Sequence, residues 1–212
     1  MIGALITRDL RHAMGGAAWL PVAFFLLVAT LVPFAVGPDA RLLERIGSGA
    51  LWIAALTAAL LPVERLIEPD RADGILDQLA LRALAEESVA AAKILSHWLT
   101  FGPLLLLAAL PGAALLGMSP EATLRAIVAL AVGTPALAAL AVAVAALTAG
   151  LPRAGALAGL VLLPLAVPVL IFGGAASSDG RSGALLLEAA MSLLITAGAP
   201  FAAGAAIRAS RT

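Results

Sequence analysis

The sequence predicts an all-α, polytopic membrane protein in which six helices cross the bilayer. Hydrophobic residues make up 62% of the 212 residues and charged residues 12%, whereas roughly a quarter of an ordinary soluble domain is charged. The charges leave six apolar stretches, each able to hold the roughly 17 to 25 residues of a spanning helix. We place the spans at about 17–36, 46–63, 94–116, 124–149, 154–174 and 186–206 of a single transmembrane domain, residues 1–212.

Helices are expected rather than strands, and the first stretch is expected to be a true span. The alternating segments of about 10 residues that form outer-membrane strands do not occur in the sequence. Backbone groups in lipid must then be paired within helices. The first stretch exceeds the roughly 7 to 15 apolar residues of a signal peptide core, and five more spans follow it.

A short amphipathic helix is expected before the first span, over residues 2–14. Its polar face carries Thr7, Arg8, Arg11 and His12. The apolar residues recur at the three-to-four spacing of a helix and are Ile2, Leu5, Ile6, Leu10 and Ala13. Such a helix lies in the membrane interface. A frayed, positively charged terminus is the alternative.

The segment 64–93 is the most charged part of the chain. It carries seven acidic and four basic residues and separates two spans from four. Pro69 and Gly74 interrupt it, and Ile75, Leu76 and Leu79 share one face of a short helix. From Glu86 a further helix is expected to run into the third span. The acidic balance suits a protein partner better than anionic lipid, although charges that are merely solvated remain the alternative.

The distribution of Lys and Arg predicts that both termini are cytoplasmic. One side of the membrane has nine: Arg8, Arg11, Arg65, Arg71, Arg82, Lys93, Arg153, Arg208 and Arg211. The other side has four: Arg41, Arg45, Arg125 and Arg181. Four of the nine lie in the segment 64–93, so the orientation depends mainly on that segment.

No motif for catalysis or nucleotide binding is present in the sequence. GxxxxGK[ST], HExxH and GxSxG are missing, and so is cysteine. We therefore expect a non-enzymatic subunit with no catalytic, metal-binding or cofactor-binding residue, whose ATP, if used, is hydrolysed by another chain. His97, beside Trp98, is interpreted as an interfacial anchor, and Glu188 as interfacial at the outer end of the last span. Gly155 and Gly159 form a GxxxG pair for dimer or helix packing.

Several segments together resemble the haem exporter protein B (CcmB) family, the permease subunit of the cytochrome c maturation system. The resemblance covers nearly the whole chain and is most specific in GPD after the first span, ER after the second, and DG..DQL. The segments are LVPFAVGPDARLL (31–43), IAALTAALLPVERLI (53–67), DGILDQL (73–79), AKILSHWL (92–99) and LLPLAVPVLIF (162–172).

The resemblance implies an ABC-2-type (type V-like) permease of the bacterial inner membrane. Two copies would work with two copies of a separate ATPase (CcmA-like), which binds the ATP. Haem would be handled by other membrane subunits (CcmC-like, CcmD-like) and a periplasmic haem chaperone (CcmE-like). The expected function is to couple ATP hydrolysis to haem export or to release of the haem-loaded chaperone. A non-translocating scaffold that assembles the haem-handling complex is the alternative.

In permeases of this type a coupling helix between the second and third spans meets the ATPase, and here it falls on Asp73 to Leu81. The expected partner contacts are Glu64, Arg65, Asp70, Asp73, Gly74, Leu76, Asp77, Gln78 and Leu79. The chain departs from the family pattern at 81–85, which reads LRALA where a proline turn is common. It also has Pro62 before Glu64, which predicts a kink at the end of the second span.

Overall fold

The computed structural model describes residues 2–14, 19–178 and 182–210, and every regular element in this part of the chain is an α-helix. Six helices are long and apolar enough to cross a membrane, so the predicted all-α, six-span class is confirmed. The elements are α1 (Ile2–Met14), α2 (Trp19–Val36), α3 (Ala40–Leu60), α4 (Val63–Leu66), α5 (Glu68–Ala72), α6 (Ile75–Leu81), α7 (Glu86–Leu115), α8 (Pro120–Thr148), α9 (Ala154–Ser178) and α10 (Ser182–Ala209).

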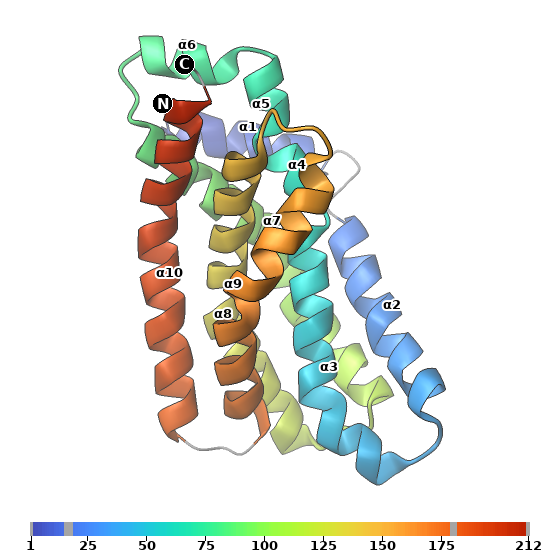
Figure 1. The fold of residues 1–212 in the computed structure, drawn as a ribbon. Helices are drawn as coiled ribbons and strands as arrows, with labels where there is room; N and C mark the ends of the chain where they lie inside the picture. Colours follow the sequence, from blue (N-terminus) through green and yellow to red (C-terminus); the bar gives the residue numbers. More distant parts are fainter. Residues whose placement is uncertain (1, 15–18, 179–181, 211–212) are drawn as a thin grey trace.

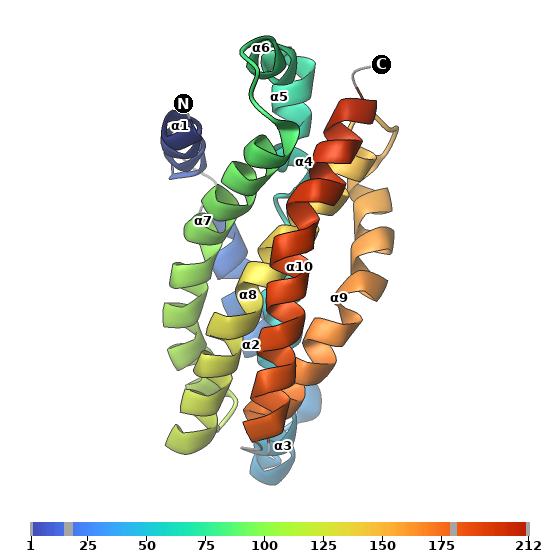
Figure 2. The same cartoon turned by 90° about the vertical axis from the view of Figure 1, so that its left-hand side faces the viewer.

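The six long helices run side by side, with α8 at the centre (Figures 1 and 2). In α8, 72% of the most apolar window is buried, against 17% in α2 at the edge of the bundle. Almost every residue of α8 between Pro135 and Thr148 is Ala, Val or Leu. Small side chains let neighbouring backbones approach closely, which explains why this helix packs against α7, α9 and α10.

Four of the long helices, α3, α7, α8 and α10, begin several residues before the predicted spans. α3 begins at Ala40 rather than near 46, because the Asp39 side chain accepts a hydrogen bond from the Leu42 N–H at 3.1 Å and caps the helix. Ser119 caps α8 in the same way. Residues 17 and 18, where we placed the start of the first span, lie outside the described residues. Hydropathy marks the lipid-facing length of a helix, and the caps set where it begins.

The predicted kink after the second span is confirmed. α3 ends at Leu60, a turn covers Leu61 and Pro62, and α4 starts at Val63. Pro62 has no N–H with which to continue the α3 hydrogen-bond ladder. The chain then forms α4, α5 and α6 before it enters α7, and α6 occupies the place where the sequence predicted a short amphipathic helix.

His97 lies inside the bundle, so its interpretation as an interfacial anchor is wrong. The side chain is buried, with Nε2 3.3 Å from the Ala59 carbonyl oxygen and the ring beside Phe101. Ala59 belongs to the last turn of α3, whose carbonyls lack partners within the helix. His97 on α7 therefore makes a polar contact at the end of α3 rather than anchoring α7 in the interface.

Glu188 is also fully buried, so its assignment to the interface is wrong. It lies at the side of α10 that faces Gly133 of α8 and Trp52 of α3. Neither carboxyl oxygen has a hydrogen-bond partner among the described residues. The position of Glu188 in the sequence places it near the end of the last span, but the sequence does not show which side of that helix faces the bundle.

Trp52 of α3, which lies beside Glu188, also contacts α8 and α9. Its ring is almost completely buried, and Nε1 donates to the Ser177 hydroxyl of α9 at 3.1 Å. The ring lies so close to Gly133 and Gly173 that a Cβ on either glycine would come within 2.4 Å and 2.2 Å of it, respectively. The two glycines therefore make the space that the indole occupies.

Candidate functional site: the charged cap

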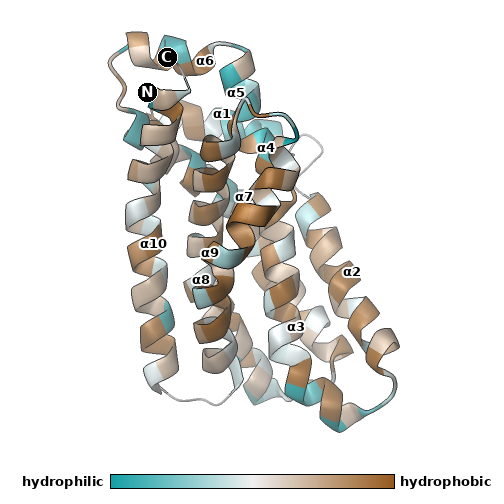
Figure 3. Ribbon diagram, viewed as in Figure 1, coloured by the Kyte–Doolittle hydropathy of each residue, from teal (hydrophilic) through white to brown (hydrophobic). Residues whose placement is uncertain are grey.

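Polar residues gather at one end of the bundle, which also holds both ends of the described chain (Figures 1 and 3). We call this region the charged cap. It consists of α1, α4 to α6, residues 82–93 and the α8–α9 connection, residues 149–153. The cap contains all the residues for which the sequence predicted a partner contact.

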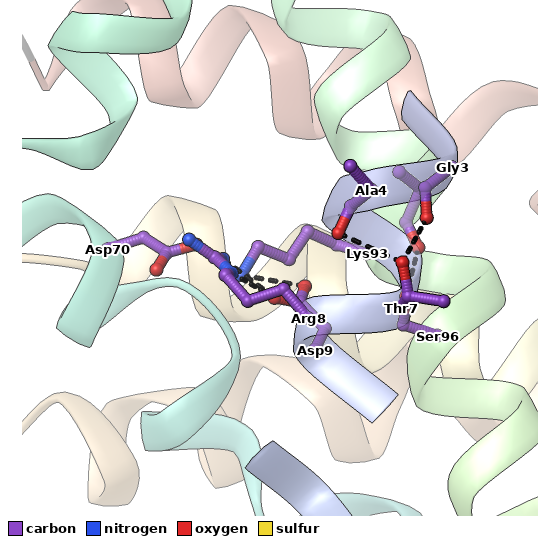
Figure 4. A network of polar contacts seen from close by, with 9 residues as sticks. Gly3, Ala4, Thr7, Arg8, Asp9, Asp70, Lys93 and Ser96 are labelled. Atoms are coloured by element: carbon purple, nitrogen blue, oxygen red, sulfur yellow. Dashed lines mark hydrogen bonds and ion pairs between the residues drawn. The ribbon is translucent and has the colours of Figure 1, made fainter. Parts of the chain in front are cut away.

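Four charged side chains from three elements form a network in the cap, which we call the buried network because Asp70 and Lys93 at its centre are buried (Figure 4). Arg8 of α1 contacts Asp9 and Asp70, each at 2.6 Å between Nη2 and a carboxylate oxygen. Lys93 of α7 pairs with Asp70 of α5, and its Nζ lies 3.1 Å from Asp9 Oδ2. The Lys93 and Asp70 side chains are only 8% and 10% exposed. The network ties the N-terminal helix and α7 to the segment between α3 and α7.

The partners in this network shift the pKa values of Asp70 and Arg8 toward their charged forms. Burial alone would raise the pKa of the Asp70 carboxyl, but the charges and hydrogen bonds of Lys93 and Arg8 outweigh it and hold that pKa below its ordinary value. Likewise, burial opposes but does not prevent the two carboxylates from raising the pKa of Arg8. Two acids and two bases thus share one low-polarity site without an excess charge.

Asp70 therefore serves the interior of the cap and not a partner surface, so its assignment as a contact residue is wrong. Its partner Arg8 lies 62 positions away in the sequence. Lys93 could have indicated the network from the sequence, because it is a cation between the apolar residues Ala92 and Ile94. A cation buried in such a position requires an acidic partner.

Two further acids, Glu64 and Glu68, bind the chain where α8 ends and α9 begins. We call these two residues and their hydrogen bonds the acid clamp. Glu64 Oε1 accepts a hydrogen bond from the Gly155 N–H at 2.8 Å, at the N-terminus of α9. Glu68 Oε2 accepts one from the Gly150 N–H, also at 2.8 Å. A carboxylate at a helix N-terminus is further stabilised by the helix dipole. The acid clamp connects α4 and α5 to both α8 and α9.

Arg71 holds Glu68 in place within the acid clamp. Its Nε and Nη2 bond the two Glu68 oxygens at 3.0 Å and 2.7 Å. These hydrogen bonds keep the pKa of Glu68 below its ordinary value. Gly150 adopts a φ of +76°, a conformation that favours glycine, and its backbone passes directly beside the Arg71 guanidinium.

Gly155 has a role other than the predicted helix packing. A Cβ on Gly155 would lie 2.2 Å from Glu64 Oε1, whereas a Cβ on Gly159 would meet nothing within 4 Å. Gly155 therefore allows the Glu64 carboxylate to reach the backbone of α9. Within this chain the pair does not bring two helices together, and a role in a dimer stays a prediction.

The α6 helix turns its apolar side toward the protein and its polar side outward. Leu76 is buried, and Leu79 is half-buried against the core. Asp77 and Gln78 are exposed, as is Asp73 at the end of α5. Leu76 is therefore not available to a partner, and its assignment as a contact residue is wrong, because so short a helix needs its apolar residues for attachment to its own chain.

The remaining predicted contact residues differ in whether they are exposed and free to meet a partner. Arg65 is exposed on α4, whereas Glu64 is exposed but occupied with Gly155. Gly74 precedes α6 with a φ of +68°, so it shapes the entry to the helix. Leu81, the last residue of the predicted coupling helix, is 88% exposed. The exposed residues of α6 are thus Asp77, Gln78 and the apolar Leu81, and the exposed Asp73 lies just before the helix.

α10 is attached to the cap as well. Arg208 pairs with Glu86 and Glu87 at the start of α7. A Cβ on Gly204 would come within 2.9 Å of the Glu87 backbone, so α10 and α7 approach closely here. Through the buried network, the acid clamp and this contact, the cap touches α7, α8, α9 and α10. The described residues hold no group of three His, Cys, Asp or Glu side chains placed to bind a metal ion.

Comparisons with known proteins give one consistent result. The family described as CcmB protein matches residues 1–210. A protein named "Heme exporter protein B" from Rhodobacter capsulatus is 47% identical over 97% of both chains. Proteins of the same name from Paracoccus denitrificans and Escherichia coli K12 are 46% and 43% identical, over 97% and 99% of both chains.

Proposed function

Since the chain belongs to the CcmB family, we propose that it is the non-catalytic permease subunit of a bacterial haem exporter complex for cytochrome c maturation. Six spanning helices make it a multi-pass membrane protein. The single observation that carries the proposal is the charged cap, in which α6 packs against α5 and the charged side chains of α4 and α5 bind α7, α9 and the connection between α8 and α9. This is the arrangement that a subunit driven from outside the membrane requires.

The driving partner in this proposal is a separate CcmA-like ATPase that docks on α6. The sequence lacks a phosphate-binding motif of its own. The cap then faces the cytoplasm, with both termini, and the protein resides in the inner membrane. A second copy of this chain, CcmC-like and CcmD-like subunits and a CcmE-like chaperone complete the complex, and haem is held by those other subunits.

Movement of α6 would reach the membrane by two routes. One passes through α5 and the buried network to α1 and α7. The other passes through the acid clamp to the connection between α8 and α9. Nucleotide-driven closure of the ATPase would thereby shift several helices together, and either haem would be exported or the haem-loaded chaperone released.

Substitutions at the two ends of the segment Asp73 to Leu81, which contains α6, test the proposed docking. The double substitution Asp73→Lys and Leu81→Asp should reduce co-purification of the ATPase about tenfold. Asp73→Lys would put a cation opposite the partner groups that met an acid, and Leu81→Asp would put an unpaired carboxylate in place of an apolar contact. Both side chains are exposed, so the melting temperature should not change. Glu121→Lys, an exposed reversal in the first turn of α8, is the control. Undiminished co-purification of the double variant would remove α6 as the docking site.

The acid clamp provides a test of coupling that is separate from docking. Gly155→Ala should displace Glu64 and lower the yield of haem-loaded cytochrome c about threefold or more, since changes within a coupling network typically cost about 0.5 to 2 kcal/mol. ATPase co-purification should persist. Gly159→Ala, in open space one turn further along α9, is the matched control. Normal maturation in Gly155→Ala cells would instead favour a scaffold that transmits no movement.

A further inference from the structure

A groove of about 580 Å³ lies at the end of the bundle away from the charged cap. Its walls come from the second half of α2, the first half of α3 and the last turns of α9. They are almost entirely apolar, with Val28 and Val32 on one side and Ile46 and Ile53 on the other. Nothing in the proposed coupling mechanism uses this groove.

Two polar side chains stand at the groove without partners. Arg45 lines it and is exposed, and it makes no ion pair or hydrogen bond with another described residue. Ser48 also lines it and is 8% exposed, and its hydroxyl has no hydrogen bond within the described part of the chain. An unpaired cation and a free hydroxyl beside an apolar wall favour a ligand with an anionic head and an apolar body.

The depth of the groove matches such a ligand. Arg45 and Ile53 are eight residues apart on α3, about 12 Å along the helix axis. Arg45 lies near the beginning of α3, where a long basic side chain reaches the headgroup level of a bilayer. The apolar walls then extend into the hydrocarbon region, where water would find few hydrogen bonds.

We propose that the groove binds an anionic phospholipid, with the phosphate on Arg45 and one acyl chain between α2 and α3. The Arg guanidinium forms paired hydrogen bonds with phosphate oxygens, and Ser48 can donate one more. Haem also combines propionates with an apolar body, but the groove has no His, Met, Cys or Tyr in its lining to ligate the iron. The proposal is independent of the ATPase and of haem transport.

Lipid binding to the full-length protein measured by native mass spectrometry tests the proposal. The protein in detergent is titrated with phosphatidylglycerol or with phosphatidylcholine of the same acyl chains. We expect phosphatidylglycerol to bind about tenfold more tightly, and Arg45→Gln to abolish this preference. Arg41→Gln, an exposed cation one turn earlier that does not line the groove, should preserve it.

A second pair of variants tests the acyl-chain part of the groove. Gly49 lines the groove and faces open space, so Gly49→Leu should fill it and prevent binding of both lipids while the fold is kept. Gly198→Leu, on α10 and also in open space, should have no effect. Unchanged phosphatidylglycerol binding in both Arg45→Gln and Gly49→Leu would overturn the proposal. So would dissociation of a dimer by Gly49→Leu, or haem binding that Gly49→Leu removes, because either result would identify another occupant.

Discussion

Asp70→Ala is expected to destabilise the folded protein by about 3 to 5 kcal/mol, because it leaves the buried Lys93 and the half-buried Arg8 with a single carboxylate between them. Asp70 contacts both Arg8 and Lys93, and the Lys93 side chain is only 8% exposed. Without Asp70, the Lys93 ammonium would keep Asp9 of α1 as its one acidic partner in the network. Thermal unfolding of the purified protein in detergent measures the effect as a lower melting temperature.

The same measurement on two further variants separates the charge effect from a loss of contacts. Asp73→Ala removes an exposed carboxylate three residues later and should change stability by no more than about 0.5 kcal/mol. Lys93→Met, combined with Asp70→Ala, removes both charges and should recover part of the lost stability. Equal melting temperatures for Asp70→Ala and Asp73→Ala would show that the network does not stabilise the cap.

Gly173→Ala is expected to cost about 3 kcal/mol, because the added methyl group would overlap the ring of Trp52. The nearest ring atoms would lie 2.2 Å, 2.4 Å and 2.7 Å from the new Cβ. The ring cannot move aside, since Trp52 is almost completely buried and its Nε1 is bonded to Ser177. A lower melting temperature and a loss of intact protein after extraction should both result.

The neighbouring glycine is the matched control. Gly174→Ala adds the same methyl group to the same helix, but no atom lies within 4 Å of its Cβ. Its melting temperature should equal that of the unaltered protein or lie slightly above it, since Ala favours the helix more than Gly. A second variant, Trp52→Leu with Gly173→Ala, should be more stable than Gly173→Ala alone if the ring is the obstacle. Equal stability of the two alanine variants would contradict the packing at Trp52.

The sequence was sufficient to predict the six spans and the position of α6, because both depend on local patterns. Lipid requires a long apolar helix wherever the chain crosses it, and Pro62 and Gly74 mark breaks through their own backbone restrictions. The helix starts at Ala40 and Pro120 were harder to place, since they depend on single capping side chains within polar residues.

The side-chain contacts of the cap could not be predicted, because their partners are distant in the sequence. Glu64 binds Gly155, 91 positions away, and a composition pattern gives no reason to join the two. Both acids of the clamp look like solvated loop charges until α9 is placed beside α4. Leu76 shows the opposite error, since an apolar residue on a short exposed helix was assigned to a partner and packs inward instead.

The buried carboxyl group of Glu188 makes one part of the bundle interior more readily hydrated than the rest. Its carboxyl oxygens have no partner among the described residues, whereas the surrounding walls are mostly apolar. If α3, α8 and α10 move apart there, entering water recovers the lost hydration of a carboxyl group, whereas the buried Ser177 and Ser192 hydroxyls are already hydrogen-bonded within the bundle. The bundle is therefore easiest to wet at Glu188, and hydration of its interior would begin at this residue.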